Sequence, residues 1–400
     1  MTKWQTRQLG EVVERASRAE TPLPGKPYRQ LGVKLWGEGA YERETIDGSQ
    51  TKYAELYRAE SGDIVVNKIW ARNGSVAVVQ ESESGCYGSS EFPMFAPLRD
   101  ELDPRWIHWL TKTPAFWSQC DEKSRGTSGK NRIRPEQFLR VEIPLPPLAE
   151  QQRLVARIEE LAGKIKEARA LRNQAAEQAE ASIVSIRRSL IGDHASENWV
   201  SLKNFVAEIE NGRSPQCESR PAEIDEWGVL KVGAISFGTF NPRENKALPV
   251  GTQFDEEFEV RRGDFLMSRA NTTELVGACA IAHETRPRLL LSDKTFRFHF
   301  REDVDVEPRW LDHTMKSPAL RAQIERGATG TSPTMKNISK QKVSELLVPP
   351  HSLSEQRRIV AELDALQAEV DTLKRLQAET ASQLDALLPS ILDKAFKGEL

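Results

Sequence analysis

Two long stretches of the chain repeat one pattern of apolar side chains. In the second stretch the repeating positions are spaced three and four apart: Leu363, Leu366, Val370, Leu373, Gln377, Thr380, Leu384, Leu387 and Ile391. Each lies 205 positions after its counterpart in the first stretch: Ile158, Leu161, Ile165, Ala168, Arg172, Ala175, Ala179, Ser182 and Ile186. Alternating steps of three and four keep one narrow stripe on one side of a helix. The pattern therefore predicts the seam of a coiled coil.

The simplest interpretation is that these two helices pair with each other inside one chain. Helices of some forty residues would be roughly 60 Å long at ~1.5 Å per residue. The alternative is two separate amphipathic helices on two globular cores, but such helices usually carry a wider apolar stripe over shorter runs. Both stretches follow a proline-rich strand end, at 143–147 and 348–351, and both begin with Leu, a small residue and Glu-Gln. Pro389 predicts a kink at Leu388, with Pro389 starting a short final helix.

The duplication extends into the segments that precede the helices. Residues 61–68 match 262–269, and Arg105-Trp106-Ile107 matches Arg309-Trp310-Leu311. Short apolar runs predict adjacent strands in each copy, at 63–67 with 75–79 and at 264–267 with 278–281. Pro104 and Pro308 indicate helix starts, and Trp106 and Trp310 are interpreted as core residues because they recur at one repeat position.

A period near 200 residues indicates a duplicated domain rather than a solenoid. Four hundred residues also exceed one ordinary core. We expect an α+β fold in which two mostly-β domains, 1–147 and 193–352, are joined by two long helical segments, 148–192 and 353–400. The copies would be related by a pseudo-twofold repeat.

Composition narrows the class of protein. The net charge is −3, which is unlike a small basic DNA-binding domain but leaves room for local basic patches. The four cysteines lie far apart, so we expect reduced thiols and no structural zinc. No stretch approaches the length of a membrane span, and the first residues lack an apolar segment. These features predict a cytoplasmic protein without membrane association.

The sequence shows no catalytic constellation. It has no glycine-rich phosphate loop ending in Gly-Lys-Ser/Thr and no Asn/Asp-Pro-Pro-Tyr/Phe segment of an adenine methyltransferase. Its six histidines are scattered without the spacing of a metal site. The short run 121–123 is a poor nuclease candidate. We therefore expect no catalytic residue, no bound metal and no enzymatic activity of its own.

The duplicated plan resembles the specificity (S) subunits of type I restriction-modification systems. The resemblance rests on the Pro-Pro-Leu-Ala-Glu-Gln-Gln-Arg start of the first helix, the Leu-Ser-Glu-Gln-Arg-Arg-Ile-Val start of the second and the closing segment 390–400. Gly126-Thr127-Ser128, matched by Gly330-Thr331-Ser332, also fits. Each motif is short, but their order is repeated twice and covers nearly the whole chain. One departure is His351-Ser352, where the family pattern has a second Pro-Pro pair.

The resemblance implies a division of labour. Each globular domain would be a target recognition domain that reads one half of a bipartite, asymmetric site in double-stranded DNA. The two helices would form an antiparallel spacer that sets the gap and docks two methyltransferase (M) subunits, through which two restriction/translocase (R) subunits would join. S-adenosylmethionine, ATP and magnesium would be expected only on those partner subunits.

Candidate DNA contacts are polar and basic side chains in loops, because Arg, Lys, Asn and small hydroxyls bind phosphates and base edges. The first set lies at 124–134 and in its twin at 326–340: Arg125, Thr127, Ser128, Lys130, Asn131 and Arg132, with Thr329, Thr331, Ser332, Thr334, Lys336 and Asn337. The second lies in the hairpin at 67–74 and its twin: Lys68, Arg72 and Asn73, with Arg269, Asn271 and Thr272.

For each set the plainer interpretation is an ordinary solvated turn or exposed hairpin. A third pair of segments, 89–91 and 292–294, is more simply interpreted as strand starts. Trp36 and Trp70 lie near these loops and could stack on bases, but core packing or an exposed hairpin is the favoured interpretation.

Two other functions fit the same plan. One is a recognition subunit of another DNA-defence or methylation assembly. The other is a coiled-coil scaffold whose β domains bind protein, which would show no salt-dependent affinity for DNA.

Overall fold

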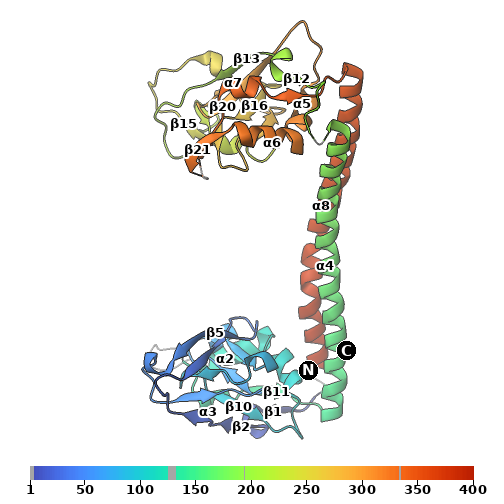
Figure 1. Ribbon diagram of the computed structural model, residues 1–400. Coiled ribbons are helices and arrows are strands. Elements are labelled where there is room, and N and C mark those ends of the chain that lie inside the picture. Colours follow the sequence, from blue (N-terminus) through green and yellow to red (C-terminus); the bar gives the residue numbers. More distant parts are fainter. Residues whose placement is uncertain (1–3, 125–131, 193, 333–334) are drawn as a thin grey trace. The chain divides into compact units, whose positions relative to one another are not determined.

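The computed structural model describes residues 4–124, 132–192, 194–332 and 335–400. Its contacts form two compact units, one of Met1–Arg172 with Gln377–Leu400 and one of Asn173–Leu376. Helices α4 (Leu148–Ile191) and α8 (Leu353–Lys397) are each continuous, and each contributes to both units (Figure 1). The expected α+β fold with two long helices is confirmed.

The first unit contains two small sheets and a two-stranded pair. Strands β2, β10, β7 and β8 form an antiparallel sheet in that order, β3-β6-β9-β4-β5 form a second, and β1 pairs with β11. The strands are β1 (Thr6–Gln8), β2 (Val13–Ala16), β3 (Ala19–Glu20), β4 (Pro27–Val33), β5 (Ala40–Asp47), β6 (Leu56–Arg58), β7 (Ile64–Val66), β8 (Val76–Val78), β9 (Tyr87–Gly88), β10 (Met94–Pro97) and β11 (Glu142–Pro144). The predicted pairing of 63–67 with 75–79 is thus observed as β7 and β8.

In the part of this unit that the structure describes, the short α-helices are α1 (Pro104–Leu110), α2 (Pro114–Ser124) and α3 (Pro135–Phe138). Helix α1 begins at Pro104 as expected, because Asp103 accepts a hydrogen bond from the Arg105 backbone N–H and proline suits the first helical position. Short 3-10 helices lie between the strands: η1 (Leu9–Glu11), η2 (Gly48–Gln50), η3 (Ala71–Asn73) and η4 (Glu81–Glu83).

The second unit also has a four-stranded main sheet, but its smaller sheets differ from those of the first unit. Its main sheet is β13-β20-β16-β18, beside three-stranded sheets β15-β14-β19 and β17-β22-β21 and the pair β12 and β23. Its elements are β12 (Val200–Ser201), η5 (Leu202–Asn204), β13 (Val206–Asn211), β14 (Gly228–Leu230), η6 (Val232–Ala234), β15 (Asn245–Ala247), η7 (Glu256–Phe258), β16 (Phe265–Ser268), β17 (Ala270–Asn271), β18 (Cys279–Ile281), β19 (Leu289–Leu290), β20 (Thr295–Phe300), α5 (Pro308–Met315), α6 (Pro318–Gly327), β21 (Thr329–Ser332), β22 (Met335–Asn337), α7 (Lys340–Ser344) and β23 (Leu347–Val348).

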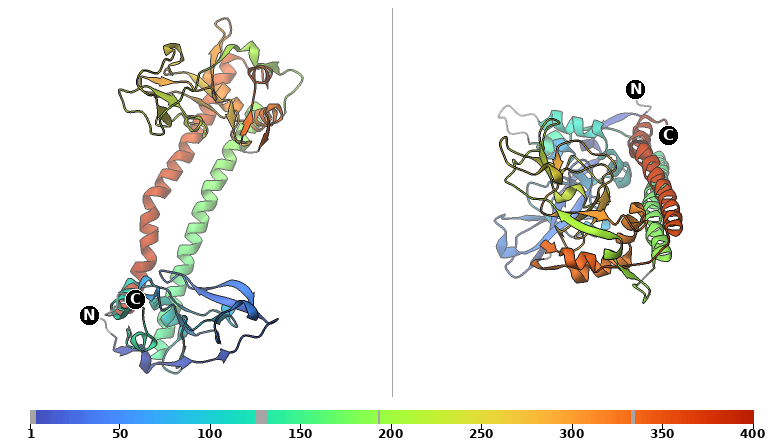
Figure 2. Two further views of the ribbon diagram at one scale, coloured as in Figure 1. Left: turned by 90° about the vertical axis from the view of Figure 1, so that its left-hand side faces the viewer. Right: turned by 90° about the horizontal axis from the view of Figure 1, so that it is seen from above.

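Within each unit the long helices pair in antiparallel fashion (Figures 1 and 2). In the first unit, Arg169 of α4 pairs with Asp385 of α8 at 2.7 Å. Arg172 and Gln377 occupy equivalent positions of the repeat, and each side chain donates to the backbone carbonyl of the other. The Gln377 NH2 group lies 3.0 Å from the Arg172 carbonyl oxygen. In the second unit, Lys374 pairs with Glu180 at 2.5 Å. The prediction that the two helices pair with each other is confirmed.

Most positions of the predicted seam are shielded from solvent. Ile158, Ile165, Leu363 and Val370 are buried, and most others are half-buried; Ser182, Thr380 and Leu387 are exposed. The prediction of a separate final helix at Pro389 is wrong, because α8 continues through it. The lost backbone hydrogen bond is offset by apolar residues on either side, which pack into the first core: Leu388, Ile391, Leu392, Ala395 and Phe396.

Both long helices complete the core of each unit. In the first, Phe396 of α8 packs edge-on against the fully buried Trp106, with ring centroids 4.6 Å apart. In the second, the fully buried Trp310 shares a core with Ile359 and Leu363 of α8, and Ile186 of α4 packs against it. The interpretation of Trp106 and Trp310 as core residues is confirmed.

The glutamine of the Glu-Gln pair at each helix start has a structural role. The carboxamide oxygen of Gln151 accepts from the Asp103 backbone N–H at 2.9 Å, and its NH2 group donates to the Pro146 carbonyl at 2.8 Å. Gln356 repeats this with the Glu307 N–H at 2.8 Å and the His351 carbonyl at 2.9 Å. Both glutamines are buried, so each ties the start of α1 or α5 to the start of a long helix.

The family departure at His351-Ser352 leaves this turn intact. The His351 Nδ1 accepts a hydrogen bond from the Trp310 indole N–H at 3.1 Å, where in the first unit the Trp106 indole donates to the Pro144 carbonyl at 3.0 Å. In the described part of the chain, no helix is both long and apolar enough to cross a membrane.

Replacing either buried glutamine by leucine should destabilise the protein by about 2–4 kcal/mol. The substitution keeps the volume but leaves a buried N–H and one or more buried carbonyls without a partner. Urea unfolding of Gln151→Leu and Gln356→Leu would measure the loss. The exposed neighbour Gln152 provides the matched control, Gln152→Leu. Equal stability of Gln151→Leu and Gln152→Leu would contradict this role.

Candidate nucleic-acid interface

The structure brings three predicted segments of the first unit together. Lys68, just after β7, donates its backbone N–H to the Glu91 carbonyl at 3.1 Å, and its own carbonyl accepts from the Ile133 N–H at 2.9 Å. The hairpin at 67–74, the segment 89–91 and the segment that begins at Arg132 therefore meet at Lys68. The segment 89–91 precedes β10, which agrees with its plainer interpretation as a strand start.

The second unit uses the same arrangement at the equivalent positions. The Arg269 backbone N–H donates to the Lys294 carbonyl at 2.8 Å, and the Arg269 carbonyl accepts from the Ile338 N–H at 3.0 Å. In each copy two loops thus converge with a third segment, which follows α2 in the first unit and α6 in the second. Backbone geometry is shared, so differences between the copies lie in the side chains that it presents.

Side-chain charges in the first unit form a cluster. Lys68 Nζ lies 3.7 Å from Glu91 Oε1, and the Arg132 guanidinium pairs with the other carboxylate oxygen. Burial lowers the pKa of Lys68, and the positive Arg132 lowers it further. Arg72, on η3, lies with its guanidinium carbon 5.9 Å from the Trp70 ring centroid.

The second unit exposes a small sheet at this place. Strand β22 pairs with β17 and β21, and residues 329–332 of β21 are exposed, including the predicted Thr329, Thr331 and Ser332. Lys336 Nζ donates to the Gly330 carbonyl at 2.6 Å. Asn337 lies opposite Ala270 in the strand register.

Other predicted residues have side chains that are held by internal hydrogen bonds or partly buried. The Asn271 side chain donates to the Ser236 hydroxyl at 2.8 Å, while its oxygen accepts from the Thr272 N–H at 2.9 Å. The Asn73 carbonyl accepts from the Trp36 N–H at 2.7 Å, and its side-chain oxygen is buried. The predicted contacts Arg125, Thr127, Ser128, Lys130, Asn131 and Thr334 lie outside the described residues.

Exposed aromatic side chains border both interfaces. Trp36 is 52% exposed and Trp70 is 45% exposed, so neither is a core residue. Phe237, equivalent to Trp36 in the repeat, is 79% exposed, and sequence reasoning did not single it out. The signal was present, because the offset of 201 that joins Asp63 to Asp264 also joins Trp36 to Phe237. Aromatic faces of this kind can stack on nucleic-acid bases.

A lysine fixes the loop that carries each aromatic residue. Lys112 Nζ donates to the Gly37 carbonyl at 2.8 Å, and Lys316 Nζ donates to the Gly238 carbonyl at 2.9 Å. Both glycines have positive φ, 69° and 78°. A Cβ on Gly37 would also lie 2.7 Å from the Thr111 carbonyl oxygen, so this loop requires glycine.

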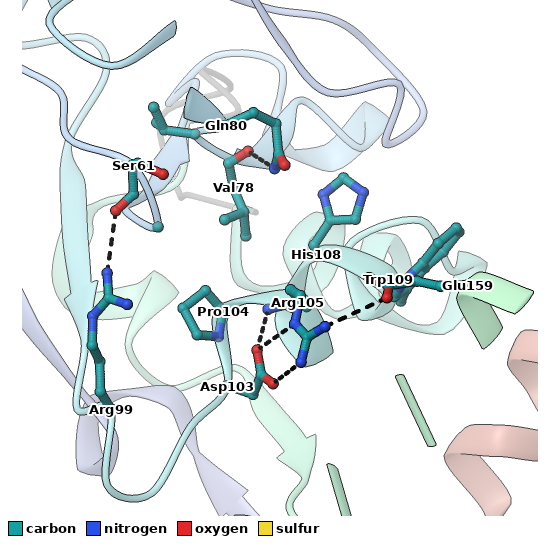
Figure 3. Close-up of a pocket in the computed structure, with 12 residues that line it drawn as sticks. Ser61, Val78, Gln80, Arg99, Asp103, Pro104, Arg105, His108, Trp109 and Glu159 are labelled. Atoms are coloured by element: carbon teal, nitrogen blue, oxygen red, sulfur yellow. Dashed lines mark hydrogen bonds and ion pairs between the residues drawn. The ribbon is translucent and has the colours of Figure 1, made fainter. Parts of the chain in front are cut away.

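A polar pocket of about 350 Å³ in the first unit is lined in part by α1 and by Glu159 of α4 (Figure 3). Asp103 accepts from Arg105 at 3.0 Å, and Arg105 reaches Glu159 of α4 at 3.4 Å. In the second unit Arg309 pairs with Asp364 of α8 at 2.6 Å at the equivalent positions. Among the residues described, no three histidine, cysteine or acidic side chains gather as a metal site would require.

Comparisons with known proteins identify relatives of one kind. A family described as "Type I restriction modification DNA specificity domain" matches residues 1–177. The chain is 22% identical to the type I restriction enzyme EcoEI specificity subunit of Escherichia coli, over 89% of this chain and 76% of that protein. It is 25% identical to the EcoKI specificity subunit of Escherichia coli strain K12, over 74% of this chain and 65% of that protein.

A solved structure extends the likeness to nearly the full length. The crystal structure of an HsdS subunit from Thermoanaerobacter tengcongensis superposes with a TM-score of 0.64 at 25% identity. The match covers 99% of this chain and 97% of that one. The match thus includes both globular domains and both long helices.

His108, in the pocket of Figure 3, should make stability depend on pH. Burial, with a smaller effect of the positive Lys112, lowers the pKa of His108 to about 4. Its unfolded pKa is near 6.5, so the unfolded chain takes up a proton first as the pH falls. Stability present above pH ~6.5 should therefore be lost towards pH ~4, by on the order of 3 kcal/mol.

Urea unfolding at pH 7.5 and pH 5 would measure this loss. His108→Gln should reduce the pH dependence, whereas the same change at the exposed His194 should not. A His108→Gln variant with the pH dependence of the unaltered protein would contradict the assignment.

Proposed function

Because the chain belongs to the type I restriction-modification specificity subunits, we propose that each of its two globular domains reads one half of a bipartite, asymmetric DNA site. Residues 1–147 and 193–352 are the two target recognition domains, and 148–192 and 353–400 are the spacer helices. The observation that carries the proposal is the repeated interface. One backbone arrangement, centred on Lys68 and Arg269, presents different side chains in each copy.

The side chains at these interfaces suit double-stranded DNA. Arg132, Lys294 and Lys336 supply cations, and residues 329–332 supply exposed hydroxyls and backbone groups. Such groups bind phosphates, while Arg, Asn and Glu discriminate base edges in the major groove. The copies differ in these side chains, which supports two unlike half-sites rather than a palindrome.

The paired helices support a fixed gap between the half-sites. Half-sites one turn apart on DNA are separated by about 34–36 Å. A paired helix bends little, whereas a flexible linker would allow many separations. The helix ends pack into the domain cores, through Phe396 in one and Ile359 in the other, and this packing ties each domain to its own helix ends.

The partners follow from the same proposal. Two M subunits dock on the repeated helices and domains, and two R subunits join through them. The chain itself supplies sequence choice and no catalysis, and S-adenosylmethionine, ATP and magnesium bind to the partners. The protein acts in the cytoplasm.

Methylome sequencing of cells with and without this gene, in the presence of the M subunits, tests the proposal. We expect methylated adenines at one asymmetric, split motif, and loss of that methylation when the gene is deleted. Purified complex should also lose DNA affinity steeply as salt rises, because lysine and arginine release counterions from phosphates.

The alternatives give different results. A recognition subunit of another defence assembly would co-purify with other partners while still showing a split motif. A protein-binding scaffold would show neither a methylation change nor salt-dependent DNA affinity. The absence of a methylation change, or of salt-dependent DNA affinity, would contradict the proposed function.

A further inference from the structure

The two interfaces carry opposite charges at one equivalent position. Glu91 and Lys294 each use a backbone carbonyl to accept from the residue that follows a core strand, Lys68 at 3.1 Å and Arg269 at 2.8 Å. The same backbone arrangement therefore presents a carboxylate in the first domain and an ammonium group in the second. Glu91 is half-buried and Lys294 is exposed.

Glu91 is held ready to accept further hydrogen bonds. Lys68 and Arg132 each contact one of its carboxylate oxygens. A carboxylate offers about four acceptor positions, so two remain for a ligand after these two contacts. The ion pairs also fix the orientation of the carboxylate before DNA arrives, which reduces the entropy that binding costs.

The second domain places its acid elsewhere. Asp293, next to Lys294, accepts from the Ser214 hydroxyl, and its main-chain carbonyl accepts from the Arg269 guanidinium at 3.2 Å. The equivalent of Asp293 in the first domain is Ser90. Each cluster thus combines two cations with one carboxylate. The difference lies in which group projects at the position of Glu91 and Lys294.

We propose, on the basis of the proposed function, that Glu91 and Lys294 occupy one equivalent position. At this position the two domains select different chemical groups on the base edges. A carboxylate accepts from the exocyclic amino group of cytosine or adenine and repels the acceptors of guanine. An ammonium group donates to guanine O6 and N7. The half-site read by the first domain therefore contains an amino-bearing base at the position that Glu91 contacts. The second half-site contains guanine at the position that Lys294 contacts.

Two variants of the complete complex test this inference by methylome sequencing. Glu91→Gln keeps the shape but adds a donor, so discrimination at one base of one half-site should fall by roughly tenfold. Lys294→Glu should replace guanine by an amino-bearing base at one position of the other half-site. The control Glu81→Gln removes the same charge from an exposed residue of η4 in the first domain and should leave the motif unchanged.

Each outcome decides between the inference and the function on which it rests. If both variants methylate the unaltered motif with unchanged preference at every base, the inference is wrong and the proposed function stands. If Glu91→Gln yields no assembled complex, the exposed Lys294 still decides, since Lys294→Glu must then change one base or the inference fails. If the unaltered protein directs no methylation to a split motif, the proposed function itself is wrong.

Discussion

The structure depends on apolar contacts between the ends of the long helices and the cores of the globular domains. Neither domain closes its core alone: Trp106 packs on Phe396 near the end of α8, and Trp310 shares its core with Leu363 near the start of α8. A buried aromatic residue and its neighbours contribute several kcal/mol, far more than an exposed ion pair. The order of domain and helix in the sequence follows from this requirement, because each core needs one end of each helix.

Buried polar groups give these contacts one geometry. Apolar surfaces can slide, but Gln151 and Gln356 bond backbone groups that exist at one place only. The charged contacts Arg105 with Glu159 and Arg309 with Asp364 lie beside them. Together these contacts set the direction in which each candidate interface leaves its own helix ends. The proposed reading of two DNA segments would need this fixed direction more than extra stability.

Much of this arrangement could be predicted from the sequence. The helix pairing followed from a stripe of period 3.5 maintained over nine positions, and the core role of Trp106 and Trp310 followed from their recurrence. Local rules failed where tertiary contacts decide. Pro389 does not end α8, because Leu388 and Leu392 are held in the core on either side. The repeat offset pairs Phe237 with Trp36, but its exposure was missed because an apolar residue in one sequence does not reveal which side faces solvent. Glu91 was interpreted only as part of a strand start, and its partners Lys68 and Arg132 come from distant segments.

Shortening both long helices by one heptad most directly tests whether they set the distance between two DNA-reading domains. Deleting residues 173–179 and 370–376 removes facing segments and keeps the reciprocal bonds of Arg172 and Gln377. The pair would become about 10 Å shorter at ~1.5 Å per residue, or about three base pairs at ~3.4 Å each. Methylome sequencing should then show both half-sites unchanged and the gap between them shorter by about three base pairs. An unchanged gap, or altered bases within a half-site, would contradict the account.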